Sequence, residues 1–153
     1  MSAMPDLERR IQALEDVEAI KKLKARYWYA VDTRQWDELA TCFAGDAVFD
    51  VPRLGRMEGG ALIVKVLKRA MRNVTTAHQG HNPEIEVTGD ATARGRWALN
   101  DRVRLPDGGS LNGCGHYDEE YVKENGSWKI RKSRLTYVFQ EASPAKADGV
   151  AAS

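Results

Sequence analysis

Apolar residues in the first part of the chain recur at steps of three and four. The series comprises Leu7, Ile11, Leu14, Val17, Ile20, Leu23, Tyr27 and Val31. This spacing matches the turn of an amphipathic helix and predicts one long helix over about residues 6–31, with a single apolar stripe. A shorter helix is expected over about 36–43. A third follows Gly59 and Gly60 and ends near 72–74.

Between the second and third helices the sequence favours one short strand. Residues 44–46 (Ala-Gly-Asp) predict a helix stop and a turn. The strand is expected at 47–51, because Pro52 ends the apolar run. A loop is expected around Gly55.

From residue 81 onward, apolar and polar positions alternate, which is the period of a strand with one buried face. Turn-forming residues interrupt this half of the chain at 89–90, 106–109 and 124–126. Strands are therefore predicted at 81–88, 91–105, 111–123 and 127–140.

Helices followed by long antiparallel strands indicate an α+β fold, with three N-terminal helices on one face of a strongly curved antiparallel sheet. The length of 153 residues suits one domain, which we place at 1–142. Residues 143–153 are rich in Ala, Ser, Pro and Gly and are expected to form a flexible tail.

Charge and composition exclude some partners. The 23 basic and 22 acidic residues give a net charge of +1, without a basic run, so nucleic-acid binding is not expected. No stretch suits a membrane span or a signal peptide, which predicts a cytoplasmic protein. Cys42 and Cys114 lack metal-ligand spacing and are interpreted as free thiols.

One carboxylate stands at the apolar end of the first predicted helix. Asp32 follows three consecutive aromatic residues and then Ala30 and Val31. A carboxylate in such a place must be solvated, paired with another group or part of a functional site. It is either a helix-terminal group paired with Arg34 or part of a site. His78 is one of three histidines, and histidine suits general-base chemistry. Alone, it also fits a hydrogen-bonded core or loop residue.

Four segments carry a resemblance to a known family. They are residues 30–36 (AVDTRQW), 76–81 (TAHQGH), 113–117 (GCGHY) and 126–130 (GSWKI). Over about residues 7–140 the chain resembles a SnoaL-like member of the nuclear transport factor 2 (NTF2) superfamily. It is most similar to the branch of scytalone dehydratase, bile-acid 7α-dehydratase and hexachlorocyclohexane dehydrochlorinase. The resemblance implies a conical NTF2-like fold around a pocket, and a homo-oligomer, with a trimer favoured and a dimer possible.

The resemblance also implies site residues. The family's aspartate and histidine roles fall on Asp32 and His78, a further site position falls on Tyr27, and another falls on Asn100 or Asp101. Tyr27 and Asp32 are separated by about 140° around an ideal helix, so both can face one pocket only if the helix end bends.

Other aromatic residues have two interpretations. Tyr29 shares the helix face of Asp32 and is a candidate for the site or for packing. Trp36, Tyr117 and Tyr121 are candidate substrate-binding residues, or aromatic residues that pack in the core. A metal site at His78 and His81 would need a third ligand, for which Glu84 is the nearest candidate. Nothing else in the sequence matches metal-ligand spacing, so no metal is expected.

These observations lead to two hypotheses. The first is a lyase or isomerase, without cofactor, that acts on a small apolar cyclic molecule. His78 would be the base, Asp32 its partner and Tyr27 a hydrogen-bond donor. The second is a non-catalytic protein that binds a hydrophobic ligand, or an accessory subunit, in which Asp32 and His78 form a structural pair.

Overall fold

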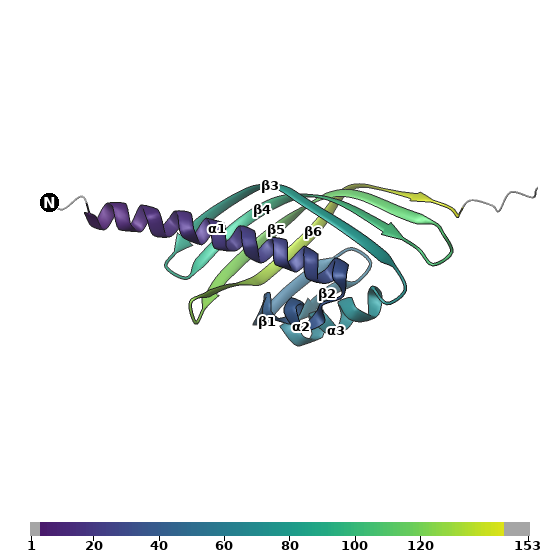
Figure 1. Ribbon diagram of the computed structural model, residues 1–153, viewed down its shortest axis with the longest axis horizontal. Helices are drawn as coiled ribbons and strands as arrows, with labels where there is room; N and C mark the ends of the chain where they lie inside the picture. The colour runs from purple at the N-terminus through teal and green to yellow at the C-terminus, as the bar shows by residue number, and fades with distance from the viewer. Residues whose placement is uncertain (1–3, 146–153) are drawn as a thin grey trace, which may run out of the picture.

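A computed structural model describes residues 4–145 of the chain (Figure 1). The helices are α1 (Met4–Thr33), α2 (Trp36–Thr41) and α3 (Gly60–Ala70). The strands are β1 (Phe43–Val51), β2 (Gly55–Glu58), β3 (Thr75–Gly89), β4 (Thr92–Arg104), β5 (Ser110–Glu124) and β6 (Ser127–Ser143). Of the expected tail, residues 146–153 lie outside the described part. Within the described part, no helix is both long and apolar enough to cross a membrane.

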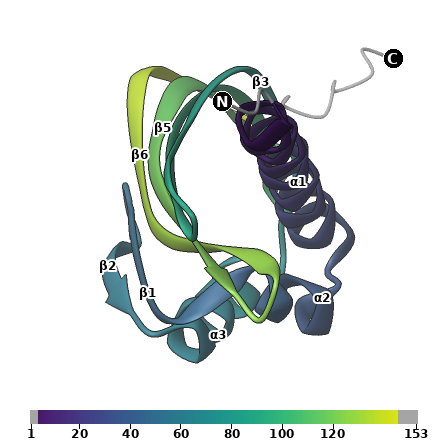
Figure 2. The ribbon, with the colours of Figure 1, turned by 90° about the vertical axis from the view of Figure 1, so that its left-hand side faces the viewer.

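All the strands belong to one open sheet with the order β2-β1-β6-β5-β4-β3. In Figure 2 the long strands curve round one side, α1 lies along the other, and α2, α3, β1 and β2 lie below. The expected α+β fold with helices against a curved sheet is therefore confirmed. One pairing differs from the prediction, because β1 runs parallel to β6. These two strands are far apart in sequence, so no hairpin turn forces them to be antiparallel.

Two strands extend beyond the predicted limits. Strand β3 begins at Thr75 instead of residue 81, because residues 75–81 pair with β4 although they lack apolar alternation. Strand β1 begins at Phe43, so the turn predicted at 44–46 is wrong. A register shift between Phe43 and Val48 absorbs these residues within the strand.

The loop expected around Gly55 is also different. The chain turns after Val51 and pairs back on β1 as the short edge strand β2. Arg53 and Gly55 both adopt positive φ angles in this turn, 70° and 77°. The sharp reversal brings β2 beside β1 without a long connection.

The predicted apolar stripe of α1 divides into two parts that face in different directions. Ile20, Leu23 and Tyr27 are buried against the sheet, whereas Leu7, Ile11 and Leu14 are exposed. At about 100° per residue, the second group points roughly opposite to the first. The interpretation as a single stripe is therefore wrong. Each step of three residues falls short of a full helical turn, so several such steps in a row move the apolar positions around to another face of the helix.

Gly80 on β3 is required by the close approach of α1. A Cβ atom built at Gly80 would lie 1.7 Å from Cη2 of Trp28. The indole of Trp28 also meets Trp97 edge to face, with ring centroids 5.2 Å apart, so it has little room to move. The helix and β3 are therefore in contact at the very segment that carries His78.

Replacement of Gly80 by alanine is expected to lower the free energy of unfolding by about 1–3 kcal/mol, because the new methyl group overlaps the buried Trp28 ring. Urea titration followed by tryptophan fluorescence measures the change. The matched control is Gly45→Ala, where a Cβ would meet no atom within 4 Å. A change of no more than about 0.5 kcal/mol is expected there. Equal stabilities of the two variants would contradict the packing argument.

Candidate active site

Asp32 and His78 lie in direct contact. Asp32 is in the last turn of α1, and His78 is on β3. The ring Nδ1 of His78 is 2.7 Å from Oδ1 of Asp32. The main-chain N–H of His78 donates to Oδ2 at 2.8 Å, and the Thr76 hydroxyl donates to Oδ1 at 2.8 Å. Because an ionised carboxylate only accepts, the ring proton lies on Nδ1, and Nε2 keeps a lone pair in the neutral imidazole.

The hydrogen bonds keep Asp32 ionised. Burial acts to raise the pKa of Asp32, but hydrogen bonds from the ring and main chain of His78 and from Thr76 outweigh it, so the pKa lies below its ordinary value. The side chains are only partly exposed, 22% for Asp32 and 12% for His78. The pair thus joins a carboxylate and an imidazole in a largely enclosed position.

Arg34 holds the two elements of this pair together. It follows α1 in a left-handed conformation with φ of 64°. Its guanidinium donates to the carbonyl oxygens of Val31 and Val74 and, at 3.1 Å, to the hydroxyl of Thr76. In the described residues Arg34 is therefore bonded to Thr76, and the helix-terminal pairing of Asp32 with Arg34 is not formed.

A cavity of about 230 Å³ adjoins His78 on the inner side of the sheet. Most of its wall is apolar and comes from β1, α3 and the ends of β4 to β6. The apolar residues are Phe49, Val51, Pro52, Leu54, Leu67, Ala70, Met71, Val74, Val103, Leu105, Leu111 and Leu135. Its polar lining includes His78, Tyr27, Asp101, Tyr117 and Tyr137. We call this cavity the inner chamber.

Tyr27 and Asp32 lie on different sides of His78. Tyr27 lines the inner chamber with His78 and is 3% exposed. Asp32 instead faces a groove of about 550 Å³ between α1 and β3, which His78 also lines. No bend of the helix is needed, because His78 lines both the chamber and this outer groove. Burial raises the pKa of Tyr27, so its hydroxyl stays protonated at neutral pH.

Asn100 and Asp101, the two alternative site residues, are neighbours on β4 and therefore point to opposite faces of the sheet. Asp101 points inward, lines the inner chamber and accepts a hydrogen bond from the hydroxyl of Tyr137. Asn100 is exposed on the outer face, where its amide oxygen accepts from the Cys114 thiol at 3.1 Å. Asp101 is therefore the polar residue of this strand at the chamber. Tyr137 on β6 was not predicted.

Four side chains expected at the site do not line the inner chamber. Tyr29 is 58% exposed and lines the outer groove, and Asn100 is on the outer face. Trp36 is partly buried against the core, away from the chamber lining. Tyr121 is buried and accepts from Nε1 of Trp97 at 2.9 Å. Of the two tyrosines predicted on β5, only Tyr117 reaches the chamber.

The chain matches the SnoaL-like domain over residues 12–134. It belongs to the SnoaL-like family. An uncharacterised protein of Mycobacterium tuberculosis H37Rv is 28% identical over 134 residues, which cover 86% of this chain and 91% of the relative.

Solved structures share the fold. Hexachlorocyclohexane dehydrochlorinase (LinA) type 2 superposes with a TM-score of 0.81 at 21% identity, over 95% of this chain and 98% of the other. A scytalone dehydratase-like protein of Novosphingobium aromaticivorans DSM 12444 gives a TM-score of 0.75 at 22% identity, over 89% and 96%. The resemblance inferred from the sequence is thereby confirmed, as is the NTF2-like fold of this SnoaL-like chain.

The SnoaL-like core also holds a buried ion pair that sequence analysis missed. Nζ of Lys24 lies 2.7 Å from Oε1 of Glu119, and both side chains are 0% exposed. Ser133 and Tyr121 donate to the same carboxylate. The signal for Glu119 was its place between Tyr117 and Tyr121, where alternation sends the side chain inward.

Lys24 lies directly behind the wall of the inner chamber. Its Nζ is 4.4 Å from the ring centroid of Tyr27, 4.5 Å from that of Trp28 and 4.1 Å from that of Tyr117. Such distances allow cation–π attraction. The two tyrosines of the SnoaL-like chamber are therefore held by a buried cation.

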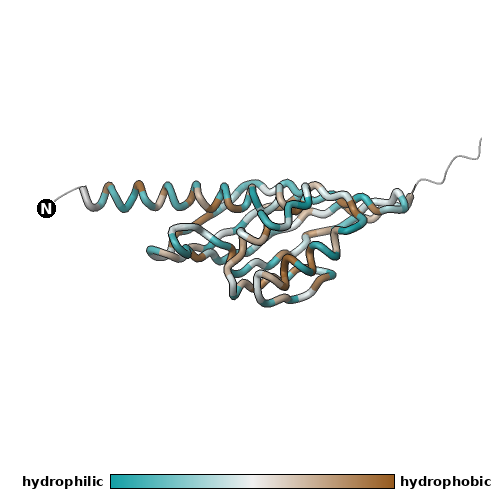
Figure 3. The backbone as a smooth tube through the Cα atoms, turned by 60° about the horizontal axis from the view of Figure 1, so that its bottom comes forward, coloured by the Kyte–Doolittle hydropathy of each residue, from teal (hydrophilic) through white to brown (hydrophobic). Residues whose placement is uncertain are grey.

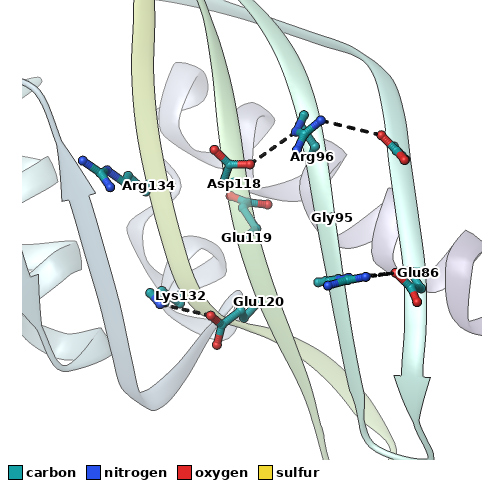
Figure 4. Close-up of a pocket in the computed structure, with 10 residues that line it drawn as sticks. Glu86, Gly95, Arg96, Asp118, Glu119, Glu120, Lys132 and Arg134 are labelled. Carbon is teal, nitrogen blue, oxygen red and sulfur yellow. Dashed lines mark hydrogen bonds and ion pairs between the residues drawn. The ribbon is translucent and has the colours of Figure 1, made fainter.

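A hollow of about 600 Å³ on the outer face of the sheet has a different character (Figure 4). Its walls carry exposed pairs of opposite charge on neighbouring strands, such as Arg96 with Asp118 at 3.3 Å and Lys132 with Glu120 at 3.0 Å. Exposed pairs of this kind contribute little to stability. This charged lining contrasts with the largely apolar lining of the inner chamber, which is the candidate site of this SnoaL-like protein.

Proposed function

We propose that this SnoaL-like protein is a lyase or isomerase that acts on a small, largely apolar cyclic molecule by acid–base chemistry, without a cofactor. The observation that carries the proposal is the contact of His78 with Asp32 at the wall of an apolar chamber. A chamber of about 230 Å³ suits a molecule of one or two rings. Apolar walls with a few polar groups are typical of small-molecule sites.

The proposed reaction begins at the free lone pair of His78. Nε2 takes a proton from a carbon or oxygen of the substrate next to a leaving group. In an elimination, the electron pair of the broken bond to hydrogen forms a double bond, and the leaving group departs with its own bonding pair. In an isomerisation, the imidazolium returns the proton to another atom of the substrate. Asp32 stabilises the imidazolium and fixes the ring orientation.

One tyrosine can donate a hydrogen bond to an oxygen of the substrate. Burial raises the pKa of both Tyr27 and Tyr137, so neither acts as a base, and the single hydroxyl proton of Tyr137 is donated to Asp101. Tyr27 lines the chamber with His78 and would polarise a substrate oxygen. Tyr137 is oriented by its hydrogen bond to Asp101.

The named activities of two structural neighbours support this reaction class. One is a dehydrochlorinase and the other is scytalone dehydratase-like. Dehydrochlorination and dehydration are both eliminations, in which a base removes a proton and a leaving group departs. Because the identities are near 20%, this support concerns the class of reaction and not the substrate.

The proposal is tested with a panel of cyclic β-hydroxy ketones and chlorinated cyclohexanes. Formation of a double bond is followed by ultraviolet absorbance, and chloride release is followed in parallel. Turnover of at least one class by the wild-type protein, lost in His78→Ala, is the expected result. Equal turnover by His78→Ala, or saturable binding of panel members without any turnover, would overturn the enzyme proposal.

Replacement of Tyr27 by phenylalanine is expected to lower kcat about 10²-fold with little change in KM, because the ring packing remains while the donor to the substrate oxygen is lost. Steady-state kinetics on the substrate found in the panel measures the effect. Tyr29→Phe is the matched control, since Tyr29 is exposed, lines the outer groove and does not line the inner chamber. A Tyr27→Phe enzyme as fast as Tyr29→Phe would remove Tyr27 from the mechanism.

A further inference from the structure

Most residues that line the inner chamber are buried or half-buried, and the exceptions mark its opening. Among the lining residues within 4–145, the exposed ones are Pro52, Arg53 and Gln140. Pro52 and Arg53 belong to the turn between β1 and β2, and Gln140 is near the end of β6. The chamber therefore opens to solvent between this turn and the last strand. We call Arg53 and Gln140 the rim.

Arg53 places an unpaired positive charge at the rim. It is the only lysine or arginine among the described residues that line the chamber. Within residues 4–145 its guanidinium forms no ion pair, whereas Arg56, three positions further on, pairs with Glu58 at 2.9 Å. A guanidinium presents several N–H donors in a plane that matches the two oxygens of a carboxylate. Arg53 can therefore bind an anionic group that enters from outside the chain.

The backbone of Arg53 gives no reason for an arginine at this position. Its φ of 70° lies in the left-handed region, which favours glycine. Gly55 in the same turn meets a similar requirement with a glycine, at a φ of 77°. A bulky residue in this region is strained, and such residues cluster at functional sites. A role for the side chain at the rim explains why an arginine stands where glycine would fit better.

One wall of the chamber comes from a segment whose charges are all positive. Residues 59–83 include no acidic residue and four basic ones, which are Lys65, Lys68, Arg69 and Arg72. The segment includes α3, in which the brown stretches of Figure 3 are interrupted by teal ones, and it lines the chamber through Met71 and Val74. The C-terminal end of a helix offsets only about half a charge. The field on this side of the chamber therefore attracts anions.

The acidic side chain of the chamber lies deeper than the rim. Asp101 is 6% exposed and accepts a hydrogen bond from the hydroxyl of Tyr137. Burial and Asp101 raise the pKa of Tyr137, whereas the charge of Arg53 acts to lower it, so the rim cation acts on a hydroxyl of the chamber. An anionic group on a ligand is thus attracted at the rim and repelled further in. A ring with one such group has a single favoured orientation, with the ring inward.

We propose that the substrate carries a carboxylate, which Arg53 binds at the rim while the apolar ring occupies the chamber beside His78. The inference rests on the proposed function, in which the chamber is the substrate site. Gln140 offers its amide N–H as a second donor. One cation and one neutral amide balance a single negative charge, as a carboxylate carries. The contact fixes the orientation of the ring relative to His78 and takes no part in the chemical step.

Binding is measured by isothermal titration calorimetry with benzoate, cyclohexanecarboxylate and naphthoate, each against its neutral carboxamide. At least one carboxylate is expected to bind about tenfold more tightly than its carboxamide. Arg53→Gln is expected to abolish this preference and to leave carboxamide binding unchanged. Arg56→Gln is the matched control, because it removes an exposed charge from β2 outside the lining. Absence of a preference in the wild-type protein, or its survival in Arg53→Gln, would overturn the proposal.

A second variant separates binding from folding. Arg53→Gly is expected to lose the carboxylate preference and to unfold at a urea concentration equal to or above that of the wild-type protein, because glycine suits a φ of 70°. A clearly lower midpoint would overturn the inference, since the arginine side chain would then serve the turn.

Kinetics distinguish this inference from the enzyme proposal. Members of the substrate panel are compared with derivatives that bear a carboxylate on the ring. The derivatives are expected to have a KM about tenfold lower, and Arg53→Gln is expected to raise KM for them alone. Equal kcat/KM for neutral and carboxylated members would overturn this inference and leave the enzyme proposal standing. Carboxylate binding that depends on Arg53, without any turnover, would support this inference and overturn the enzyme proposal.

Discussion

The variant Asp32→Asn is expected to reduce kcat about 10²–10⁴-fold on the substrate identified for the wild-type protein. The amide can still occupy the space of the carboxylate, but it carries no charge to stabilise the imidazolium of His78, and its NH₂ group can reverse the tautomer. Steady-state kinetics measures the loss. Asp37→Asn on α2 is the matched control, because Asp37 is an exposed carboxylate nearby. Wild-type turnover by Asp32→Asn would show that the pair is structural.

The same variant tests how the free energy of unfolding depends on pH. Because hydrogen bonds hold the pKa of Asp32 below its ordinary value, the ionised group stabilises the folded state above the unfolded pKa of about 3.9. This stabilisation is lost as the pH falls through the lower, folded pKa. The difference in unfolding free energy between wild type and Asp32→Asn should therefore be full at neutral pH and shrink below about pH 4. An unchanged difference from pH 7 to pH 3 would contradict the assignment.

The second large effect is expected at Lys24. Lys24→Met should lower the free energy of unfolding by about 3–5 kcal/mol, because the methionine preserves much of the packing but leaves Glu119 buried without its cation. Burial lowers the pKa of Lys24, whereas Glu119 acts to raise it, so each charge depends on the other. Urea unfolding of the purified variant measures the loss.

A double variant separates the pair from general packing. Lys24→Met combined with Glu119→Gln removes both charges, and its destabilisation should be clearly smaller than the sum of the two single effects. Ser133 donates to Oε1 and Tyr121 to Oε2 of Glu119, so one of the two hydroxyls can still donate to the amide oxygen at position 119. Strictly additive effects would show that the ion pair contributes no coupling energy.

The elements that could be predicted best from the sequence are those with a clear apolar period and turn-forming residues at their ends. Tight turns such as Glu124 to Gly126 divide the strands, and the long helix follows from its apolar positions. The start of β3 could not be predicted, because Thr75 to His81 is held by pairing with β4 and not by an apolar face. That segment carries His78, so its contact with Asp32 came from the family resemblance and not from the pattern of the residues.

The depth of a side chain along a strand was the other source of error. Tyr117, Glu119 and Tyr121 alternate regularly on β5 and are all buried on the same face. Tyr121 lies further along the strand, where it bonds to Glu119 and does not line the chamber. Lys24 was hidden among the charged residues of α1, since its ion partner is 95 positions away in the sequence.

The position of His78 between the inner chamber and the outer groove has a consequence for isotope labelling. A catalytic base that is shielded from water returns the same hydrogen that it removed. His78 instead lines both the inner chamber and, together with Asp32, a groove that is open to water. The abstracted hydrogen can therefore be exchanged while the substrate is still bound. Reactions run in D₂O should leave deuterium in recovered substrate at the carbon from which the hydrogen was taken, and in any isomerised product at the carbon that receives the returned proton.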